Sequence, residues 1–293
     1  PLVIAGGPCA SNPEPLAPFI DLFLLGEAEA AIEEIIDEYL LAQEKDKNRE
    51  ELLKELAALD GVYVPRFYSI EYNEEGTVSE IEVAKGVKRG VKKRVVEDLD
   101  EAFYPTKFIV PYMDVVHDRV NLEIARGCTS GCRFCQAGMI YRPVRERSHE
   151  RIKELAQKLI SNTGFEEISL TSLSSGDYTG IADLATDLVE EYEEEKISVA
   201  LPSMRVDSFS IDLAEELQKV RKTGLTFAPE AGTQRLRDVI NKGIAEEDII
   251  SAAADAFEAG WRKIKLYFMI GLPTETEEDL QGIVDLAKKL AAL

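Results

Sequence analysis

Hydrophobic positions in the second half of the chain follow a strand-then-helix order. Apolar runs of strand length lie at residues 121–125, 167–171, 197–201, 224–228 and 263–270. Between them, apolar residues recur every three or four positions, as at Ile181, Leu184 and Leu188, which predicts amphipathic helices. This alternation predicts an α/β fold whose parallel strands are joined by right-handed crossovers and curl as in a barrel.

The first 118 residues follow two other patterns. In residues 1–60, a short apolar run ends at Gly6-Gly7, and Ile32, Ile35 and Ile36 predict a helix with one buried stripe, so this segment reads as the end of an α/β unit. In residues 61–118, β-branched and aromatic residues alternate on both sides of a turn signal at 73–76, which predicts a β-hairpin connector. The expected domains are therefore 1–60, 61–118 and 119–293.

Polar or glycine-rich loops follow each predicted strand of the last domain. They are a cysteine-rich loop and the segments 174–177, 202–205, 229–232 and 271–275. In parallel barrels, chemistry is carried by the loops at the carboxyl ends of the strands. In and just after the last segment, Thr274 and Thr276 each lie three residues before an acid, a capping-box signal for a final helix. We expect the loops to converge on one site.

Three of the four cysteines lie in one loop, as Cys128-x3-Cys132-x2-Cys135. Three thiolates on a short turn suit three irons of a [4Fe–4S] cluster and leave the fourth iron open to a substrate's amino and carboxylate groups. A closed zinc site needs a fourth ligand, and His117 and His149, the two histidines, lack ligand spacing. We expect both histidines to be structural or surface residues.

Composition and charge indicate which ligands and which cellular compartment to expect. The net charge of −21, from 34 basic and 55 acidic residues, argues against broad phosphate binding. Two basic regions run against this trend: residues 85–94, best explained as a solvated hairpin, and six arginines around the cysteines that could hold an anion. With no membrane-span or signal pattern and no disulfide framework, the sequence predicts a cytoplasmic protein.

The cysteine run, with Phe134 before its last cysteine, resembles the signature of radical S-adenosylmethionine (SAM) enzymes. The similarity covers about 119–293. Within this family, the chain resembles most the subgroup that has a cobalamin-binding domain. Members of this subgroup carry runs similar to Val116-His-Asp-Arg, Leu201-Pro-Ser-Met-Arg-Val-Asp, Leu225-Thr-Phe-Ala-Pro-Glu-Ala-Gly-Thr and Phe268-Met-Ile-Gly-Leu-Pro-Thr-Glu-Thr. The implied fold is a partial (β/α)6 barrel preceded by the C-terminal part of a Rossmann-like cobalamin-binding domain.

The resemblance also implies roles for particular residues. Cys128, Cys132 and Cys135 would bind the cluster, whose open iron takes the amino and carboxylate groups of SAM. The loop Ser175, Gly176 and Asp177 would receive the amino group, Arg205 with Ser203 the carboxylate, and Glu230 the ribose hydroxyls. Adenine would be flanked by the backbone at Phe134 and by the apolar edge that includes Ile270 and Leu272.

The resemblance further implies what lies outside this sequence. The histidine that would coordinate cobalt falls upstream of Pro1, so cobalamin is expected only in the full-length protein, and a sixth barrel strand is expected beyond Leu293. The expected activity is reductive cleavage of SAM to a 5′-deoxyadenosyl radical, with electrons from an external donor such as flavodoxin or ferredoxin.

Within this family the sequence leaves open methylation, methylthiolation or another radical modification. No motif identifies the substrate. The arginines of residues 142–151 indicate only that it is an anionic molecule such as RNA. The alternative is a non-catalytic RNA-binding module in which the three thiolates and one borrowed ligand hold structural zinc.

Overall fold

The computed structural model describes residues 1–113, 115–202, 204–206, 210–221 and 224–293. The chain divides into two compact units, Pro1–Phe103 and Tyr104–Leu293. The three-part division expected from the sequence remains a prediction.

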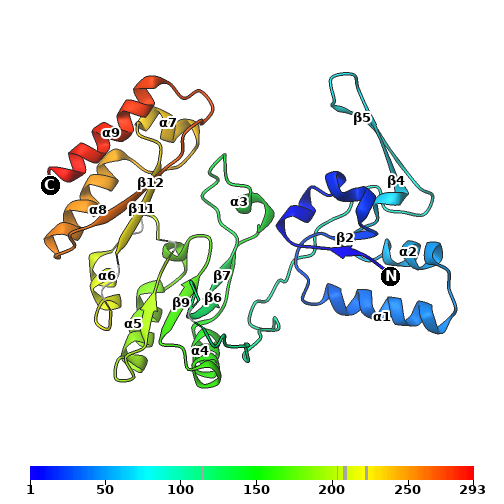
Figure 1. Cartoon of the computed structure of the whole chain (residues 1–293), viewed down its shortest axis with the longest axis horizontal. Coiled ribbons are helices and arrows are strands. Elements are labelled where there is room, and N and C mark those ends of the chain that lie inside the picture. The colour runs from blue at the N-terminus through cyan, green and yellow to red at the C-terminus, as the bar shows by residue number, and fades with distance from the viewer. Residues whose placement is uncertain (114, 203, 207–209, 222–223) are drawn as a thin grey trace. The chain divides into compact units, whose positions relative to one another are not determined.

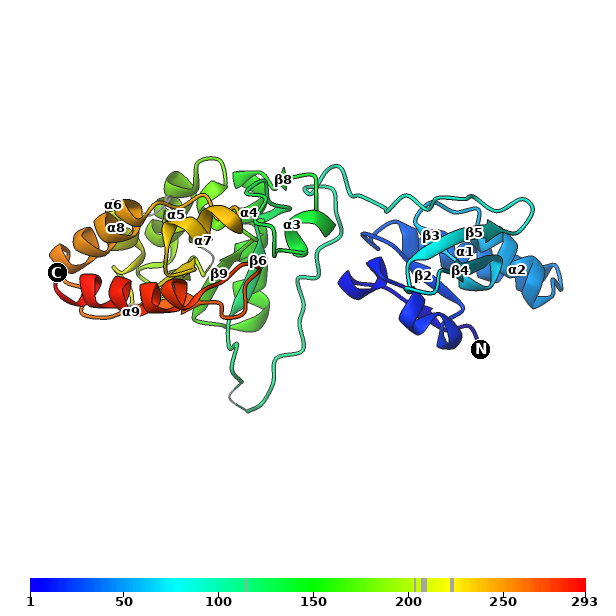
Figure 2. The same cartoon turned by 90° about the horizontal axis from the view of Figure 1, so that it is seen from above.

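The first unit contains a small mixed sheet next to two helices. Strand β1 (Ile4–Ala5) pairs in parallel with β2 (Leu22–Leu24), and β3 (Val62–Tyr63) pairs with β2 in the antiparallel direction. Helices α1 (Ala31–Glu44) and α2 (Arg49–Leu56) share an apolar core with this sheet (Figure 2). Single-turn or short 3-10 helices are η1 (Pro8–Ser11), η2 (Glu14–Phe19) and η3 (Pro65–Phe67).

The predicted hairpin is present. Strand β4 (Tyr68–Tyr72) pairs antiparallel with β5 (Val78–Val83) around the turn in which the Gly76 amide donates to the Asn73 carbonyl at 2.9 Å. Gly76 has φ +81°, a conformation that glycine adopts without steric cost. Val62 and Tyr63, which the alternation groups with the hairpin, lie in β3 instead.

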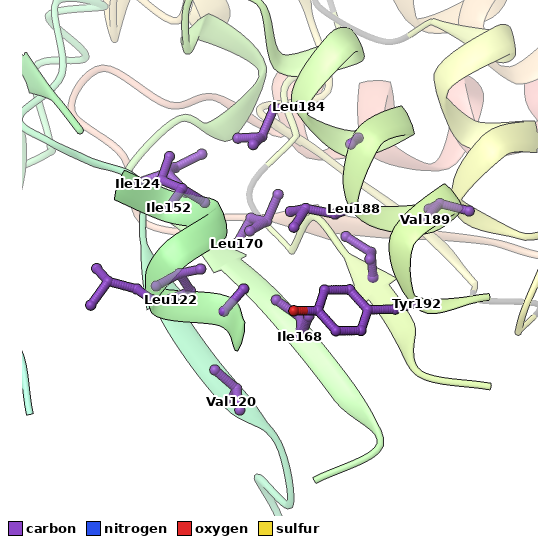
Figure 3. Close-up of a cluster of buried hydrophobic side chains, with 14 of the residues drawn as sticks. Val120, Leu122, Ile124, Ile152, Ile168, Leu170, Leu184, Leu188, Val189 and Tyr192 are labelled. Atoms are coloured by element: carbon purple, nitrogen blue, oxygen red, sulfur yellow. The ribbon is translucent and has the colours of Figure 1, made fainter. Parts of the chain in front are cut away.

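The second unit begins with a parallel sheet in the order β10–β9–β6. Its strands are β6 (Val120–Glu123), β9 (Glu167–Thr171) and β10 (Ser198–Ala200). Helices α4 (His149–Thr163) and α5 (Ile181–Tyr192) pack on this sheet (Figure 1). Figure 3 shows the resulting core, in which leucines and isoleucines of strands and helices interdigitate.

A second parallel pair follows. Strand β11 (Leu225–Glu230) pairs with β12 (Ile264–Phe268), with Phe227 opposite Leu266 and Glu230 opposite Phe268. Helices α8 (Glu246–Glu258) and α9 (Glu277–Ala291) lie alongside this pair (Figure 1). Helix α7 (Gln234–Val239) follows β11, while helix α6 (Ile211–Leu217) packs with its Leu213 and Leu217 in the core of the first sheet.

These elements confirm the α/β fold with parallel strands, since each predicted apolar run contains or overlaps an observed strand. Among the described residues, β10 and β11 are not hydrogen-bonded to each other, so the parallel strands form two sheets instead of one continuous curl. A cavity of about 220 Å³ lies between them, lined by Val199 and Leu201 on one side and Leu225 and Phe227 on the other.

The expected capping box at the last helix is confirmed at one of its two candidates. Thr276 is the N-cap of α9, and Asp279 accepts hydrogen bonds from its amide and hydroxyl, each at 2.9 Å. Thr274 lies before the helix in the left-handed region, with φ +66°.

Candidate functional site

The cysteine-rich loop leaves the end of the first sheet through a tight backbone passage. It follows β7 (Ala125–Arg126), which pairs antiparallel with β8 (Arg145–Glu146), and it ends at α3 (Ala137–Ile140). Gly127 has φ +88°, and a Cβ there would lie 2.6 Å from the Pro143 carbonyl oxygen. Glycine is therefore required where the loop starts.

All three cysteines of the loop are free thiols and partly exposed. The Ser130 amide donates to Cys128 Sγ at 3.5 Å, and the Gly138 amide donates to Cys135 Sγ at 3.4 Å. Backbone N–H donors directed at sulfur are a feature of iron–sulfur ligation. The donor set therefore fits a thiolate-bound cluster.

In the part of the chain that the structure describes, no group of three or more His, Cys, Asp or Glu side chains is gathered around one ion position. Structural zinc requires four ligands at one ion. A [4Fe–4S] cluster places each thiolate on a different iron, so it does not require the sulfurs to meet at one point.

The cysteine loop is held by a turn more than 100 residues away in sequence. The Arg133 amide donates to the Ile240 carbonyl at 2.8 Å, and its guanidinium donates to the Val239 carbonyl. Asn241 Nδ2 donates to the Gly131 carbonyl at 3.0 Å. These contacts place the turn 239–242, which the sequence patterns did not single out, beside the candidate metal ligands.

The loop after β9 contains the three residues expected to receive the SAM amino group. Ser175 is fully buried, and its hydroxyl donates to the Leu170 carbonyl at 3.2 Å, so its side chain braces the loop. Gly176 is partly exposed and Asp177 is exposed, both in the short 3-10 turn η4 (Ser175–Asp177). The groups accessible to a ligand are thus Gly176 and Asp177.

Arg205 and Glu230 come together around a residue that the sequence analysis missed. Arg205 Nη2 donates to the Lys242 carbonyl at 3.2 Å, while Lys242 Nζ lies 3.3 Å from Glu230 Oε1. Glu230 ends β11 with φ +68°, an unfavourable conformation for a non-glycine residue. Ser203 lies outside the described residues.

The residues expected to flank adenine differ in exposure. Phe134 and Ile270 are exposed, Ile270 at 77%. Leu272 is buried in a small apolar cluster with Ala231, Leu236 and Ile240. Leu272 therefore supports the segment that carries Ile270, and its side chain is covered by neighbours.

The arginines around the cysteines are largely engaged within the protein. Arg126 forms a bidentate pair with Glu123, with both N–O distances 2.9 Å, and Arg151 pairs with Glu154. Arg147 is buried, donates to the Glu123 carbonyl and lies over the Tyr104 ring, whose pKa is raised by burial. The expectation of a positive rim for an anionic substrate is weakened by these contacts.

His149 is partly buried at the start of α4, and His117 lies on the surface. His149 stacks on Tyr178 with ring centroids 5.5 Å apart, and its Nε2 lies 3.2 Å from the Thr179 carbonyl oxygen. His117 Nδ1 lies 2.9 Å from Arg119 Nη2. Neither contact involves a cysteine.

Two family profiles match the chain. The profile of the Radical SAM superfamily matches residues 122–287, and that of radical SAM proteins, N-terminal, matches residues 1–65. The chain belongs to the radical SAM superfamily. Membership implies an enzyme that uses a [4Fe–4S] cluster and SAM, and the non-catalytic zinc alternative loses its support.

Several curated proteins are similar to this radical SAM chain over much of its length. An uncharacterised protein of Methanocaldococcus jannaschii is 33% identical over 290 residues, which cover 99% of this chain and 56% of the relative. An uncharacterised methyltransferase of Pyrococcus horikoshii is 25% identical, with coverages of 98% and 58%. The chain thus spans little more than half the length of these two relatives.

A third relative is a methylthiotransferase. The threonylcarbamoyladenosine tRNA methylthiotransferase of Aquifex aeolicus is 26% identical over 178 residues, which cover 59% of this chain and 43% of the relative. Homologues of the chain therefore include proteins named as methyltransferases and as methylthiotransferases.

Solved structures share the fold at low identity. The radical SAM methyltransferase TsrM from Kitasatospora setae, with cobalamin and a [4Fe–4S] cluster bound, has a TM-score of 0.62 at 15% identity, covering 98% of this chain and 53% of TsrM. The cobalamin-dependent SAM radical enzyme OxsB has a TM-score of 0.63 at 18% identity, covering 97% and 38%. Both comparisons extend through both units of the chain.

None of the helices that the structure describes combines the length and apolar character that a membrane span requires.

Proposed function

We propose that Cys128, Cys132 and Cys135 hold the [4Fe–4S] cluster and that the loops at the carboxyl ends of the strands bind SAM beside it. The observation that carries this proposal is the free cysteine loop, with amide donors on two of its sulfurs. When bound, the cluster supplies the electron that cleaves SAM to methionine and a 5′-deoxyadenosyl radical.

The chain's own residues bind and orient SAM. Gly176 and Asp177 receive the ammonium group, because a carboxylate accepts hydrogen bonds from such donors. Arg205 holds the SAM carboxylate, for which a planar guanidinium is suited, and Ser203 assists it. Glu230 accepts from the ribose hydroxyls, and the Phe134 backbone and Ile270 flank adenine, with Leu272 supporting Ile270 from the core.

For the reaction, we propose methylation of an unreactive carbon. Support comes from the similarity of the chain to an uncharacterised methyltransferase of Pyrococcus horikoshii and from the fold shared with TsrM, a methyltransferase whose structure contains cobalamin. Cobalamin in the full-length protein would carry the methyl group. A small external electron carrier of the flavodoxin or ferredoxin class would reduce the cluster.

Methylthiolation is the second candidate, and RNA is the proposed substrate class. The similarity to a tRNA methylthiotransferase favours both. Comparison of modified nucleosides between cells with and without the full-length gene separates the two reactions. A lost nucleoside that carries an added methyl group supports methylation, while a lost methylthio nucleoside supports the second candidate.

The cluster assignment is tested by Cys128→Ala. After anaerobic reconstitution with iron and sulfide, the unaltered protein should show broad absorbance near roughly 400 nm, and the variant should lose it together with 5′-deoxyadenosine formation. Cys9→Ala is the matched control, since Cys9 is an exposed free thiol of the first unit. Equal absorbance in Cys128→Ala and the control would overturn the assignment.

A further inference from the structure

The turn 239–242, which begins at the last residue of α7, contacts the cysteine loop, Arg205 and Glu230. Its Ile240 carbonyl and Asn241 amide hold the cysteine loop. Its Lys242 carbonyl accepts a hydrogen bond from Arg205, and the Lys242 ammonium pairs with Glu230. A single short segment therefore joins the metal-binding loop to the groups proposed for the SAM carboxylate and ribose.

The Lys242–Glu230 pair is shielded from water. The two side chains are 10% and 16% exposed, and Lys242 Nζ lies 3.3 Å from Glu230 Oε1. Salt and water screen a partly buried pair less than an exposed one. Removing one member of such a pair leaves the other charge uncompensated, which costs more than the loss of an exposed pair.

The backbone fixes both members of the pair. The Lys242 amide donates to the Arg237 carbonyl at 2.9 Å, and the preceding Asn241 adopts a left-handed conformation with φ +53°. On the other side, the Glu230 carbonyl accepts from the Met269 amide at 2.8 Å at the end of β11. The direction of the Glu230 side chain is thus set at its base by the sheet and at its tip by Lys242.

We propose that Lys242 is a positioning residue that orients the Glu230 carboxylate toward the SAM ribose. This inference rests on the function proposed above, in which Glu230 accepts from the ribose hydroxyls. A carboxylate has about four lone-pair sites, so one oxygen on Lys242 leaves capacity for two hydroxyl donors. In the ligand-free protein, the Lys242 ammonium also supplies the compensating charge that the partly buried Glu230 carboxylate needs.

The test compares SAM with methionine, which has the same amino and carboxylate groups and lacks the ribose. Both are titrated against the electron paramagnetic resonance signal of the reduced cluster. In Lys242→Met, the dissociation constant for SAM should rise about tenfold or more, the effect expected for a disrupted hydrogen bond to a charged group. The dissociation constant for methionine should stay unchanged.

Two further variants separate a positioning role from a structural one. Lys242→Arg keeps a cation beside Glu230 and should restore most of the SAM affinity. The double variant Lys242→Met with Glu230→Gln should bind SAM no more weakly than Glu230→Gln alone, because residues that act through one contact are not additive. Lys288→Met, at an exposed lysine of α9, is the control for loss of a lysine.

The outcomes distinguish this inference from the function on which it rests. Equal weakening of SAM and methionine, additive losses in the double variant, or unchanged SAM affinity in Lys242→Met would each overturn the role of Lys242. If the unaltered protein assembles no iron–sulfur cluster, or if SAM leaves its signal unchanged, the proposed function fails first. Iron and sulfide content, measured for every variant, shows which of the two has failed.

Discussion

The two parallel sheets of the second unit are built differently. The β10–β9–β6 sheet packs on α4 and α5 through an apolar core in which Leu170 and Leu188 have no exposed surface. The β11–β12 sheet has a smaller apolar cluster, and Arg237, Lys242 and Asp279 are buried near it, whereas the charged side chain buried at the first sheet, among the described residues, is Arg147. Apolar burial is non-directional, whereas buried charges need partners at defined positions.

This difference indicates a division of roles. The first sheet stabilises the base from which the cysteine loop projects. The second sheet uses polar contacts to place Glu230 and the turn 239–242. Substitutions in the first sheet should therefore act mainly on the free energy of unfolding. Substitutions of the buried charges should act on the positions of Glu230 and the turn 239–242.

The largest effect is expected from Leu170→Ala in the central strand β9. Removing this fully buried side chain should lower the free energy of unfolding by about 2–5 kcal/mol. Leu266→Ala, in the partly exposed strand β12, should cost about 1–2 kcal/mol, because less apolar surface returns to water. Urea unfolding followed by the fluorescence of Trp261, the single tryptophan, measures both. Equal costs would show that the two sheets share one core.

A smaller loss of stability is expected from Gly232→Ala, at the point where α9 approaches the loop after β11. A Cβ at Gly232 would lie 2.2 Å from the Ile283 amide nitrogen, so Gly232→Ala must displace helix backbone and should cost about 1–3 kcal/mol. Gly224→Ala is the matched control, since a Cβ there meets nothing within 4 Å. Similar unfolding midpoints for the two variants would contradict the close approach.

The smallest effect is the pH dependence of the α9 cap. Hydrogen bonds from Arg235 and Thr233 hold the pKa of the Asp279 carboxyl well below its ordinary value of 3.8. Because the folded pKa is the lower one, this carboxylate stabilises the fold above about pH 4, and the contribution is lost as the pH falls further.

Thermal unfolding of Asp279→Asn at several pH values tests this prediction. The midpoint should fall below that of the unaltered protein at neutral pH, and the gap should narrow below about pH 4. Asp285→Asn, at an exposed position of the same helix, should show little gap at either pH. A gap for Asp279→Asn that is constant with pH would exclude a role for its ionisation.

Much of the fold could be predicted from the sequence because its patterns are local. The apolar runs located β6, β9, β10, β11 and β12, and the threonine–acid spacing located the start of α9. The exposure of individual site residues was less predictable. Ser175 and Leu272 look like ligand residues in the sequence, but both side chains are buried against neighbours that lie on other elements or on the preceding strand.

The sequence by itself determined the cysteine loop and the family, because three cysteines at this spacing lie on one short segment that can be read without the fold. Only the tertiary structure shows that Asn241 hydrogen-bonds to Gly131, and that Lys242 pairs with Glu230 and accepts a hydrogen bond from Arg205. Periodicity reports which face of an element is buried, and it carries no information on which distant turn will face it. The order in which the parallel strands and their crossovers pack brings the turn 239–242 to the cysteine loop.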